Sequence, residues 1–427
     1  MRIAILNGNP DVQNRAFDDY LARLAEVLAA EQHQVTALTL REMDIRYCVG
    51  CFGCWVKTPG QCGTADDSHQ VGRAVINSDF TLWAAPLRMG FPSALLKKTL
   101  DKTIPLIHPY FAVDQNEAHH RARYPRYPLL GLLLEREPDG DDEDARIVGD
   151  VLSRTALNMK SRLSFVAFTG QPVEEVARAI ADGANNRVSY ARDLAPIPGV
   201  RVTPPTRLTA FNGSPRGPQG NTPLMLEQFL KGFAANEGRS TELFHLNRLG
   251  DLERHREAFA AAESVLLGFP LYTDAMPGIV KAFIEALEPL RGRAGNPPLG
   301  FLVQSGFAEA IHSRHVERYL AKLAARLGCP YLGTLVKGGG GSTRSMPENM
   351  TRRLFTSLAE IGRAFGATGQ FDPAMLRALA KPERYPAIQM PLLKLTYGLL
   401  VNPLYWGSQL KANGAYDQRS ARPFLDV

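Results

Sequence analysis

Two short stretches, one in each half of the sequence, carry the same pattern and constrain the fold more than any other feature. They are IAILNGNP at 3–10 and LTAFNGSP at 208–215, each an apolar run that ends in Asn-Gly-x-Pro. An apolar run followed by turn residues predicts a buried strand that leads into a loop.

A second matched pair follows in the same order. PLRMGFPSALLK at 86–97 and PLYTDAMPGIVK at 270–281 each come after an apolar strand and open a predicted helix. Two pairs of matching segments in the same order indicate an internal duplication. Asn7 and Pro86 are 79 residues apart, whereas Asn212 and Pro270 are 58 apart, so the first half carries 21 extra residues.

Strands and helices alternate within each half. After the first strand, four apolar residues recur at helical spacing, namely Phe17, Leu21, Leu24 and Leu28. Further strands are predicted at 34–40, 80–85, 128–134 and 163–168, and in the second half at 242–246, 265–269, 299–304 and 331–336. Alternating units of this kind predict an α/β fold with a doubly wound parallel sheet in each half, with ligands outside the carboxyl ends of the strands.

The chain has 427 residues, which favours two to three domains. Pro196, Pro198, Pro204 and Pro205 predict a stiff linker near residue 200. We therefore expect domains at 1–200 and 205–370, and a C-terminal extension at 371–427 packed on the domains. Its leucine-rich groups are expected to cover an apolar surface, with peripheral membrane contact as the alternative.

Composition excludes several classes of protein. The net charge of +6 is spread over the chain without a long basic run, so we expect no nucleic-acid partner. The longest apolar stretch, 390–406, is interrupted by Lys394, Asn402 and Pro403, so no transmembrane segment is expected. No secretory signal is visible at the N-terminus, and a cytoplasmic location is the default expectation.

The richest loop is NGSPRGPQGNT at 212–222, between the first strand and the first helix of the second half. Backbone N–H groups of such a loop and the helix N-terminus form an anion site. Ser214 and Thr222 add hydroxyls, Arg216 a charge and Asn221 an amide. Because the Lys-Ser/Thr pair of a nucleotide P-loop is missing, the loop suits one phosphate monoester better than a triphosphate.

This loop and the segment 270–287 resemble the flavodoxin-like NAD(P)H-dependent FMN reductases, over essentially both halves. The resemblance implies two tandem flavodoxin-like five-stranded sheets, the second with a C-terminal extension, and FMN as cofactor with NAD(P)H as co-substrate. It implies that the four side chains named above hold the FMN phosphate, and that the isoalloxazine is wrapped by Pro270, Leu271, Tyr272, Thr273, Asp274 and Met276. A third loop at the flavin edge would be formed by Gln304, Ser305 and Gly306. A homodimer is also common among such flavoproteins.

The first half departs from this pattern. Its loop, NGNPDVQNR at 7–15, has no Ser or Thr, and Asp11 places a carboxylate where a phosphate would sit. Since like charges repel, we expect a degenerate flavin site there, with a second FMN as the alternative.

Four cysteines, Cys48, Cys51, Cys54 and Cys62, lie in the extra segment of the first half. Four thiolates suit a [4Fe-4S] cluster or a tetrahedral zinc ion, and a close triple with a remote fourth is more like ferredoxin ligation. The spacing resembles that of iron-sulfur flavoproteins, in which an acidic pair such as Asp66 and Asp67 commonly follows. Reduced or redox-active thiols are the third interpretation.

The leading hypothesis is an FMN-dependent NAD(P)H oxidoreductase that relays electrons through a [4Fe-4S] cluster to a small-molecule or protein acceptor. No catalytic side chain is identified, because a flavin supplies the chemistry itself. One alternative is an electron-transfer protein reduced by a partner, and another is a zinc-stabilised, non-catalytic binding module on a flavodoxin-like frame.

Overall fold

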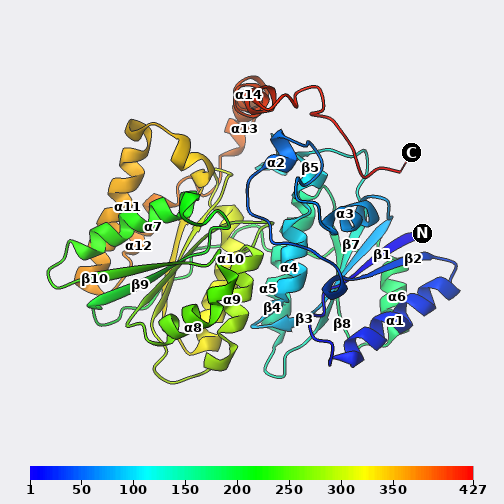
Figure 1. Ribbon diagram of the computed structural model, residues 1–427, viewed down its shortest axis with the longest axis horizontal. Coiled ribbons are helices and arrows are strands. Elements are labelled where there is room, and N and C mark those ends of the chain that lie inside the picture. Colours follow the sequence, from blue (N-terminus) through cyan, green and yellow to red (C-terminus); the bar gives the residue numbers. More distant parts are fainter. Residues whose placement is uncertain (427) are drawn as a thin grey trace. The chain divides into compact units, whose positions relative to one another are not determined.

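The chain forms two compact units in the computed structural model, which describes residues 1–426 (Figure 1). The first unit comprises Met1–Ala191 together with the C-terminal segment that begins at Pro386, and the second comprises Arg192–Tyr385. Residues 371–385, which we expected to begin the extension, are part of the second unit.

The first unit contains five parallel strands in the order β2-β1-β3-β7-β8. The strands are β1 Arg2–Asn7, β2 Gln34–Thr39, β3 Phe80–Arg88, β7 Leu129–Glu135 and β8 Leu163–Phe168, and a short β4 at Phe91–Pro92 pairs with β3 in the antiparallel direction. The helices are α1 Arg15–Ala30, α2 Gly53–Val56, α3 Ser68–Ile76, α4 Ala94–Asp101, α5 Asp142–Asn158 and α6 Val173–Ala181. The strand order confirms the predicted flavodoxin-like sheet.

The second unit repeats this order as β10-β9-β11-β12-β13. The strands are β9 Arg207–Asn212, β10 Ser240–His245, β11 Val265–Pro270, β12 Leu299–Gln304 and β13 Tyr331–Lys337. The helices are α7 Asn221–Ala234, α8 Leu252–Ala260, α9 Gly278–Ala286, α10 Ile311–Leu327, α11 Glu348–Thr368 and α12 Pro373–Leu379. The prediction of two five-stranded parallel sheets is therefore confirmed.

Each core follows from the apolar periodicity of the sequence. In the first unit, Phe17, Leu21, Leu24 and Leu28 of α1 are buried against Ile3 and other residues of the sheet. In the second unit, α7 and α11 supply the buried apolar residues of one face. These helices lie on the sheet because their apolar side chains recur every three to four residues.

The duplication includes the turn that follows the third strand of each unit, β3 in the first and β11 in the second. Met89 and Gly90 in the first unit, and Thr273 and Asp274 in the second, all have positive φ angles. Two successive left-handed residues produce a tight reversal. The same unusual backbone in both units supports a common origin for the two loops.

A buried ion pair is also duplicated on the helix after this turn. Lys97 contacts Asp101 on α4, and Lys281 contacts Glu285 on α9, each four residues apart. Both lysine side chains are almost completely buried. A buried ammonium group needs such a carboxylate, because an uncompensated charge in the interior is very costly.

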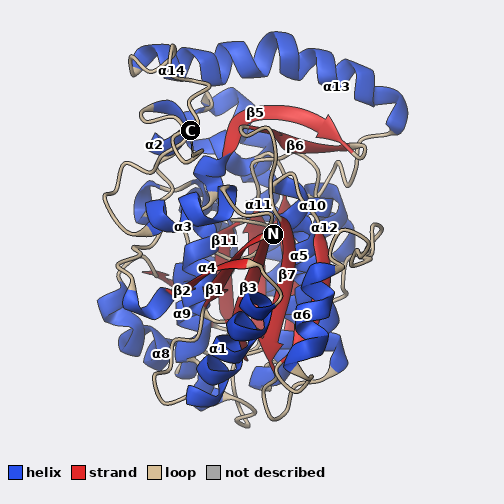
Figure 2. Ribbon diagram, turned by 90° about the vertical axis from the view of Figure 1, so that its right-hand side faces the viewer, coloured by secondary structure: helices blue, strands red, loops and turns tan. Residues whose placement is uncertain are grey.

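The first unit carries two additions that the described part of the second lacks. One is the cysteine segment, and the other is an antiparallel hairpin of β5 Ile107–Asp114 and β6 Glu117–Ala122. The C-terminal segment forms a helical run of α13 Met390–Thr396, a π-helical stretch Tyr397–Gly407 and α14 Ser408–Ala412. This run lies along the hairpin (Figure 2). None of the helices within residues 1–426 has the length and hydropathy that a bilayer crossing requires.

Specific contacts fasten the helical run to the first unit. The side chain of Asn402 accepts a hydrogen bond from Phe111 N at 2.8 Å and donates one to Phe111 O at 2.9 Å. Trp406 packs edge-on against Trp55, with ring centroids 5.5 Å apart. Further along, Gly60 has a φ of +91°, and a Cβ there would lie 2.8 Å from Pro423, so the close approach of the chain requires glycine.

Replacing the buried indole tests this attachment. We predict that Trp406→Ala lowers the free energy of unfolding of the first unit by about 3–5 kcal/mol, because it leaves a cavity beside Trp55. Leu404→Ala, on the exposed side of the same run, should change it by less than about 0.5 kcal/mol. Urea unfolding followed by circular dichroism measures both, and equal effects would show that Trp406 does not anchor the run.

Candidate functional site

The loop after β9 has the features of an anion site. The helix α7 begins at Asn221 without a side-chain cap, so its first N–H groups are not satisfied by a capping side chain. Ser214 and Thr222, which bracket the loop, are buried. Gly220 is required here, because a Cβ would lie 2.1 Å from Ser214 Oγ. Buried hydroxyls beside an uncapped helix N-terminus suit a phosphate group.

The side chain of Asn221, a predicted phosphate ligand, forms two hydrogen bonds to a distant segment. Its Nδ2 donates to Gly341 O at 2.5 Å, and its Oδ1 accepts from Arg344 N at 2.9 Å. The Arg344 guanidinium in turn donates to Gly220 O and Pro218 O. The side chain of Asn221 therefore connects the loop after β9 to the glycine-rich segment after β13.

The three predicted loops of the second unit come together at the carboxyl ends of its strands. Leu271 N donates to Gln304 O at 2.7 Å, which joins the second loop to the third. Gln304 Nε2 lies 3.5 Å from Thr222 Oγ1, and the buried Gln304 Oε1 has no hydrogen-bond partner among the described residues. An unsatisfied buried amide oxygen beside this loop fits a site that a polar ligand completes.

The predicted flavin-contacting residues differ in exposure. Buried are Ser214, Asn221, Thr222, Pro270, Asp274, Met276, Gln304 and Ser305. Partly buried are Arg216, Leu271, Tyr272 and Thr273, whereas Gly306 is exposed.

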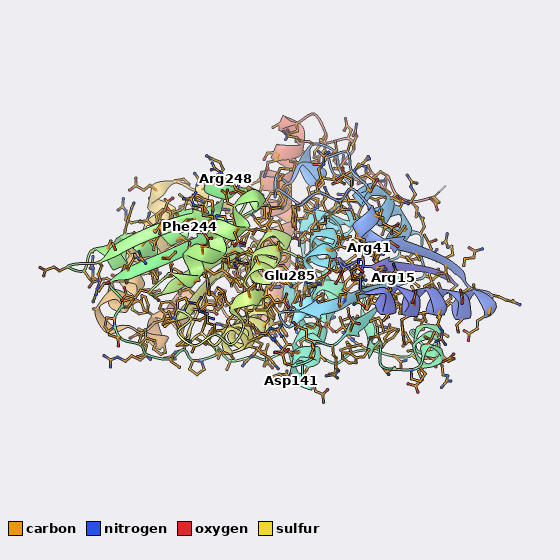
Figure 3. The ribbon with its side chains drawn as sticks, turned by 60° about the horizontal axis from the view of Figure 1, so that its bottom comes forward. Arg15, Arg41, Asp141, Phe244, Arg248 and Glu285 are labelled. Atoms are coloured by element: carbon orange, nitrogen blue, oxygen red, sulfur yellow. The ribbon has the colours of Figure 1, made fainter. Side chains whose placement is uncertain are left out.

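In the first unit the corresponding loop is filled by protein side chains. Asn14 Oδ1 caps α1 by accepting from Phe17 N at 3.3 Å, and its Nδ2 donates to Glu135 at 2.6 Å. Asp18 accepts a hydrogen bond from Asn7 and pairs with Arg41 at 2.9 Å. Although burial opposes the shift, these partners lower the pKa of Asp18. Figure 3 shows Arg41 near Arg15, the first residue of α1. The N-terminus of α1 is thus capped and bordered by carboxylates.

The second loop of the first unit is occupied in the same way. Glu137, which is almost buried, accepts from Met89 N at 2.8 Å and from Gly90 N at 2.6 Å. A carboxylate therefore holds backbone N–H groups at the turn that corresponds to Thr273 and Asp274. This arrangement supports the degenerate site expected in the first unit, which stays a prediction.

The four cysteine thiols lie within electrostatic reach of one another. Burial raises the pKa of Cys54 well above its ordinary value, and the sulfurs of Cys48, Cys62 and Cys51 raise it further. Burial also raises the pKa of Cys48, to about 12. Gly53 N donates to Cys51 Sγ at 3.4 Å, which is the type of N–H···S contact that stabilises thiolates.

Two buried cations border the thiols. Lys102 Nζ lies 3.2 Å from Cys62 Sγ and 2.9 Å from Asp66, and both of these charged side chains are buried. Although burial opposes it, these contacts raise the pKa of Lys102. Arg123 is 1% exposed and its Nε and Nη2 have no hydrogen-bond partner among the described residues, while its charge acts on Cys54. The unused donors of this buried guanidinium suit an acceptor group nearby.

Within the described part of the chain, no three Cys, His, Asp or Glu side chains are placed so that they could hold a metal ion.

Several buried charged or titratable residues near these segments are not marked by the sequence. Lys102 and Arg123 are 40 and 61 positions from Cys62, and no local motif marks them. Beyond the third loop, Glu309 and His312 are both fully buried and 3.8 Å apart, and the His312 ring lies 4.8 Å from that of Phe307. The Glu309-to-His312 spacing on the chain is a weak signal by itself.

Comparison with known families agrees with the duplication. The family model described as NADPH-dependent FMN reductase matches residues 1–121 and again 206–336. Together these segments cover more than half of the chain.

An individual relative and solved structures give more distant matches. An iron-sulfur flavoprotein from Archaeoglobus fulgidus is 25% identical over 103 residues, which are 24% of this chain and 49% of the relative. The chain thus spans about half the length of this relative. An azoreductase from Bacillus anthracis is 15% identical and covers 38% of this chain and 100% of its own, with a TM-score of 0.31. An NAD(P)H:quinone oxidoreductase from Methanothermobacter marburgensis is 14% identical over 37% of this chain and 98% of its own, also with a TM-score of 0.31.

Thiol alkylation tests the environment of the cysteines. We predict that in metal-free protein at neutral pH iodoacetamide modifies the exposed Cys51 at least about tenfold faster than Cys54, because the buried thiol with a raised pKa yields little thiolate. Cys329, which is also buried with its pKa raised to about 12, should react as slowly as Cys54. Mass spectrometry of timed samples measures the rates, and similar rates at Cys51 and Cys54 would contradict the arrangement.

Proposed function

The chain belongs to the NADPH-dependent FMN reductase family, and from this we propose that it is an FMN-dependent NAD(P)H oxidoreductase with two redox sites. The second unit would bind FMN, and the four cysteines of the first unit would hold a [4Fe-4S] cluster. Electrons from the nicotinamide co-substrate would pass to a small-molecule or protein acceptor.

One observation carries the flavin assignment. The helices that follow the two corresponding loops differ at their N-termini. Asn14 caps α1, whereas α7 has no side-chain cap and is flanked by Ser214 and Thr222. A phosphate binds more favourably at a helix N-terminus that has no carboxylates beside it, because the phosphate is itself negatively charged. The second unit is therefore the better place for FMN.

The residues of this site would then act mainly as binding groups. Ser214 and Thr222 would donate hydroxyl hydrogens to the phosphate, with Arg216 adding charge from the loop. Asn221 would contribute its backbone N–H, while its side chain keeps the glycine-rich segment in place. The turn at 272–275, closed by two hydrogen bonds between Tyr272 and Ala275, would support the isoalloxazine through its backbone.

The two groups supply complementary chemistry when bound. A flavin accepts two electrons as hydride and can release them singly, and an iron-sulfur cluster carries one electron at a time. The protein contributes position, shielding from water and electrostatic environment.

The donor set and its surroundings favour the cluster. Four thiolates around a [4Fe-4S] core carry net negative charge, and Lys102 and Arg123 offset charge in a buried site. The unused donors of Arg123 match the acceptor capacity of cluster and thiolate sulfurs. The distant iron-sulfur flavoprotein relative is consistent with this proposal.

Removing the two hydroxyls tests the flavin site. We predict that Ser214→Ala and Thr222→Ala each weaken FMN binding about tenfold to a hundredfold, because each lost hydrogen bond to a charged phosphate costs about 1.5–3 kcal/mol. Titration of flavin-free full-length protein by fluorescence quenching measures the dissociation constant.

The control is Gln13→Ala, an exposed residue in the corresponding loop of the first unit, which should leave binding unchanged. If both hydroxyl variants bind FMN as tightly as the parent protein, the flavin lies elsewhere and the assignment is wrong.

Replacing one cysteine tests the cluster separately. We predict that Cys51→Ser loses most of the bound iron but keeps its FMN content and the bleaching of flavin by NAD(P)H. Rapid passage of electrons to one-electron acceptors should be lost. Iron and flavin assays on anaerobically purified protein and stopped-flow spectroscopy measure these properties.

Cys329→Ser, which removes a cysteine of the second unit, should keep both iron and electron transfer. An iron-free Cys51→Ser variant that transfers electrons at the parental rate would exclude the relay and leave a plain flavin reductase.

A further inference from the structure

The C-terminal helical run is apolar on two opposite faces. Its inner face packs on the hairpin and the cysteine segment of the first unit through Met390, Tyr397, Asn402, Trp406 and Leu410, all of them buried (Figure 2). This face accounts for the attachment of the run. Most of the leucines in the run are exposed and do not lie on it.

The outer face exposes large apolar side chains along its length. Leu392 is 65% exposed, Leu399 63% and Leu404 66%, and the same face includes Ile388, Leu395, Leu400 and Tyr405. A helix at the surface of a water-soluble protein normally presents polar residues on this side, and a helix that is apolar all round is normally covered on every side. An apolar band of this kind marks a surface that binds a partner.

The charges of the segment indicate which partner. From Pro386 to Ala415 the sequence has no Asp or Glu, and its charged residues are Lys394 and Lys411, both exposed. Lys394 lies among the exposed leucines of α13. A cationic, leucine-rich helix with a tyrosine at its edge has the composition of helices that lie in the headgroup region of a bilayer.

A second copy of the chain fits this face less well. Pairing two such helices would bury apolar side chains, but it would also bring lysines together without an acidic residue in the segment to compensate them. Anionic lipid headgroups supply both an apolar layer for the leucines and negative charge for the lysines.

We propose that the outer face of the run Ile388–Tyr405 docks the protein on the surface of an anionic membrane, with the helix parallel to the bilayer. The inference does not depend on bound FMN or on a cluster. Docking would place the bilayer on the side of the run opposite to the cysteine segment, because Trp406 on the inner face contacts Trp55, the neighbour of Cys54 in the sequence.

Vesicle binding by the full chain tests the proposal. We expect the protein to co-sediment with vesicles of phosphatidylcholine and phosphatidylglycerol in equal parts, and several-fold less with phosphatidylcholine alone. The double variant Leu395→Asp with Leu399→Asp should bind the mixed vesicles at least about tenfold more weakly, because two exposed leucines no longer enter the apolar layer. Both positions are exposed, so the fold should tolerate the changes.

Matched controls are Val12→Asp and Met350→Asp, which replace equally exposed apolar residues elsewhere and should leave vesicle binding unchanged. Absence of binding by the parent protein, or equal binding by the double variant, would overturn the proposal. A dimer in light scattering that the double variant abolishes, without vesicle binding, would overturn it in favour of a second copy on this face.

Discussion

One hydrogen bond in each unit sets the path of the loop on which the rest of the site depends. Asn7 Oδ1 accepts from Asn9 N, and Asn212 Oδ1 accepts from Ser214 N, both at 3.0 Å. Because the side chain of the last strand residue holds the backbone two positions later, the chain leaves both sheets in the same direction and starts a helix beside the strand end. The first N–H groups of that helix must then be satisfied, either by the protein itself or by a ligand. The first unit uses the side chain of Asn14, whereas no side chain caps α7 in the second unit.

In the first unit, the protein's own side chains satisfy the N-terminus of α1, and this has an electrostatic consequence. Asn14, which caps the helix, also donates a hydrogen bond to Glu135. Asp18 and Glu137 place further carboxylates at the same sheet edge. A phosphate there would meet negative charge in a partly buried setting, where repulsion is weakly screened. The unit instead carries the cysteine segment, whose acidic residue Asp66 is paired with Lys102. The two units thus carry different polar groups, with carboxylates and cysteines in the first and the hydroxyls of Ser214 and Thr222 in the second.

Sequence reasoning succeeded where the information is local. The strands predicted at 163–168 and 299–304 agree residue by residue with β8 and β12, because continuous apolar runs between turn residues specify buried parallel strands. It failed where contacts join distant residues. Nothing near Asn402 shows that its amide binds the backbone of Phe111, which is 291 positions away. Likewise, nothing near Asn221 shows that its side chain binds Gly341 O and Arg344 N of the glycine-rich segment after β13. The sheet edge could be predicted from periodicity, but its closure by remote segments could not.

The C-terminal run shows how such a remote segment alters the chemistry of the site that it covers. Trp406 and Trp55 pack with Cys54 in one buried cluster, and Arg123 donates to Arg419 O and Ala421 O of the same C-terminal segment. The position of a buried cation near the thiols therefore depends on the segment remaining attached. Its attachment is a matter of apolar packing and a few hydrogen bonds, while its outer face is also apolar. The polarity around the cysteines therefore depends on the attached C-terminal segment.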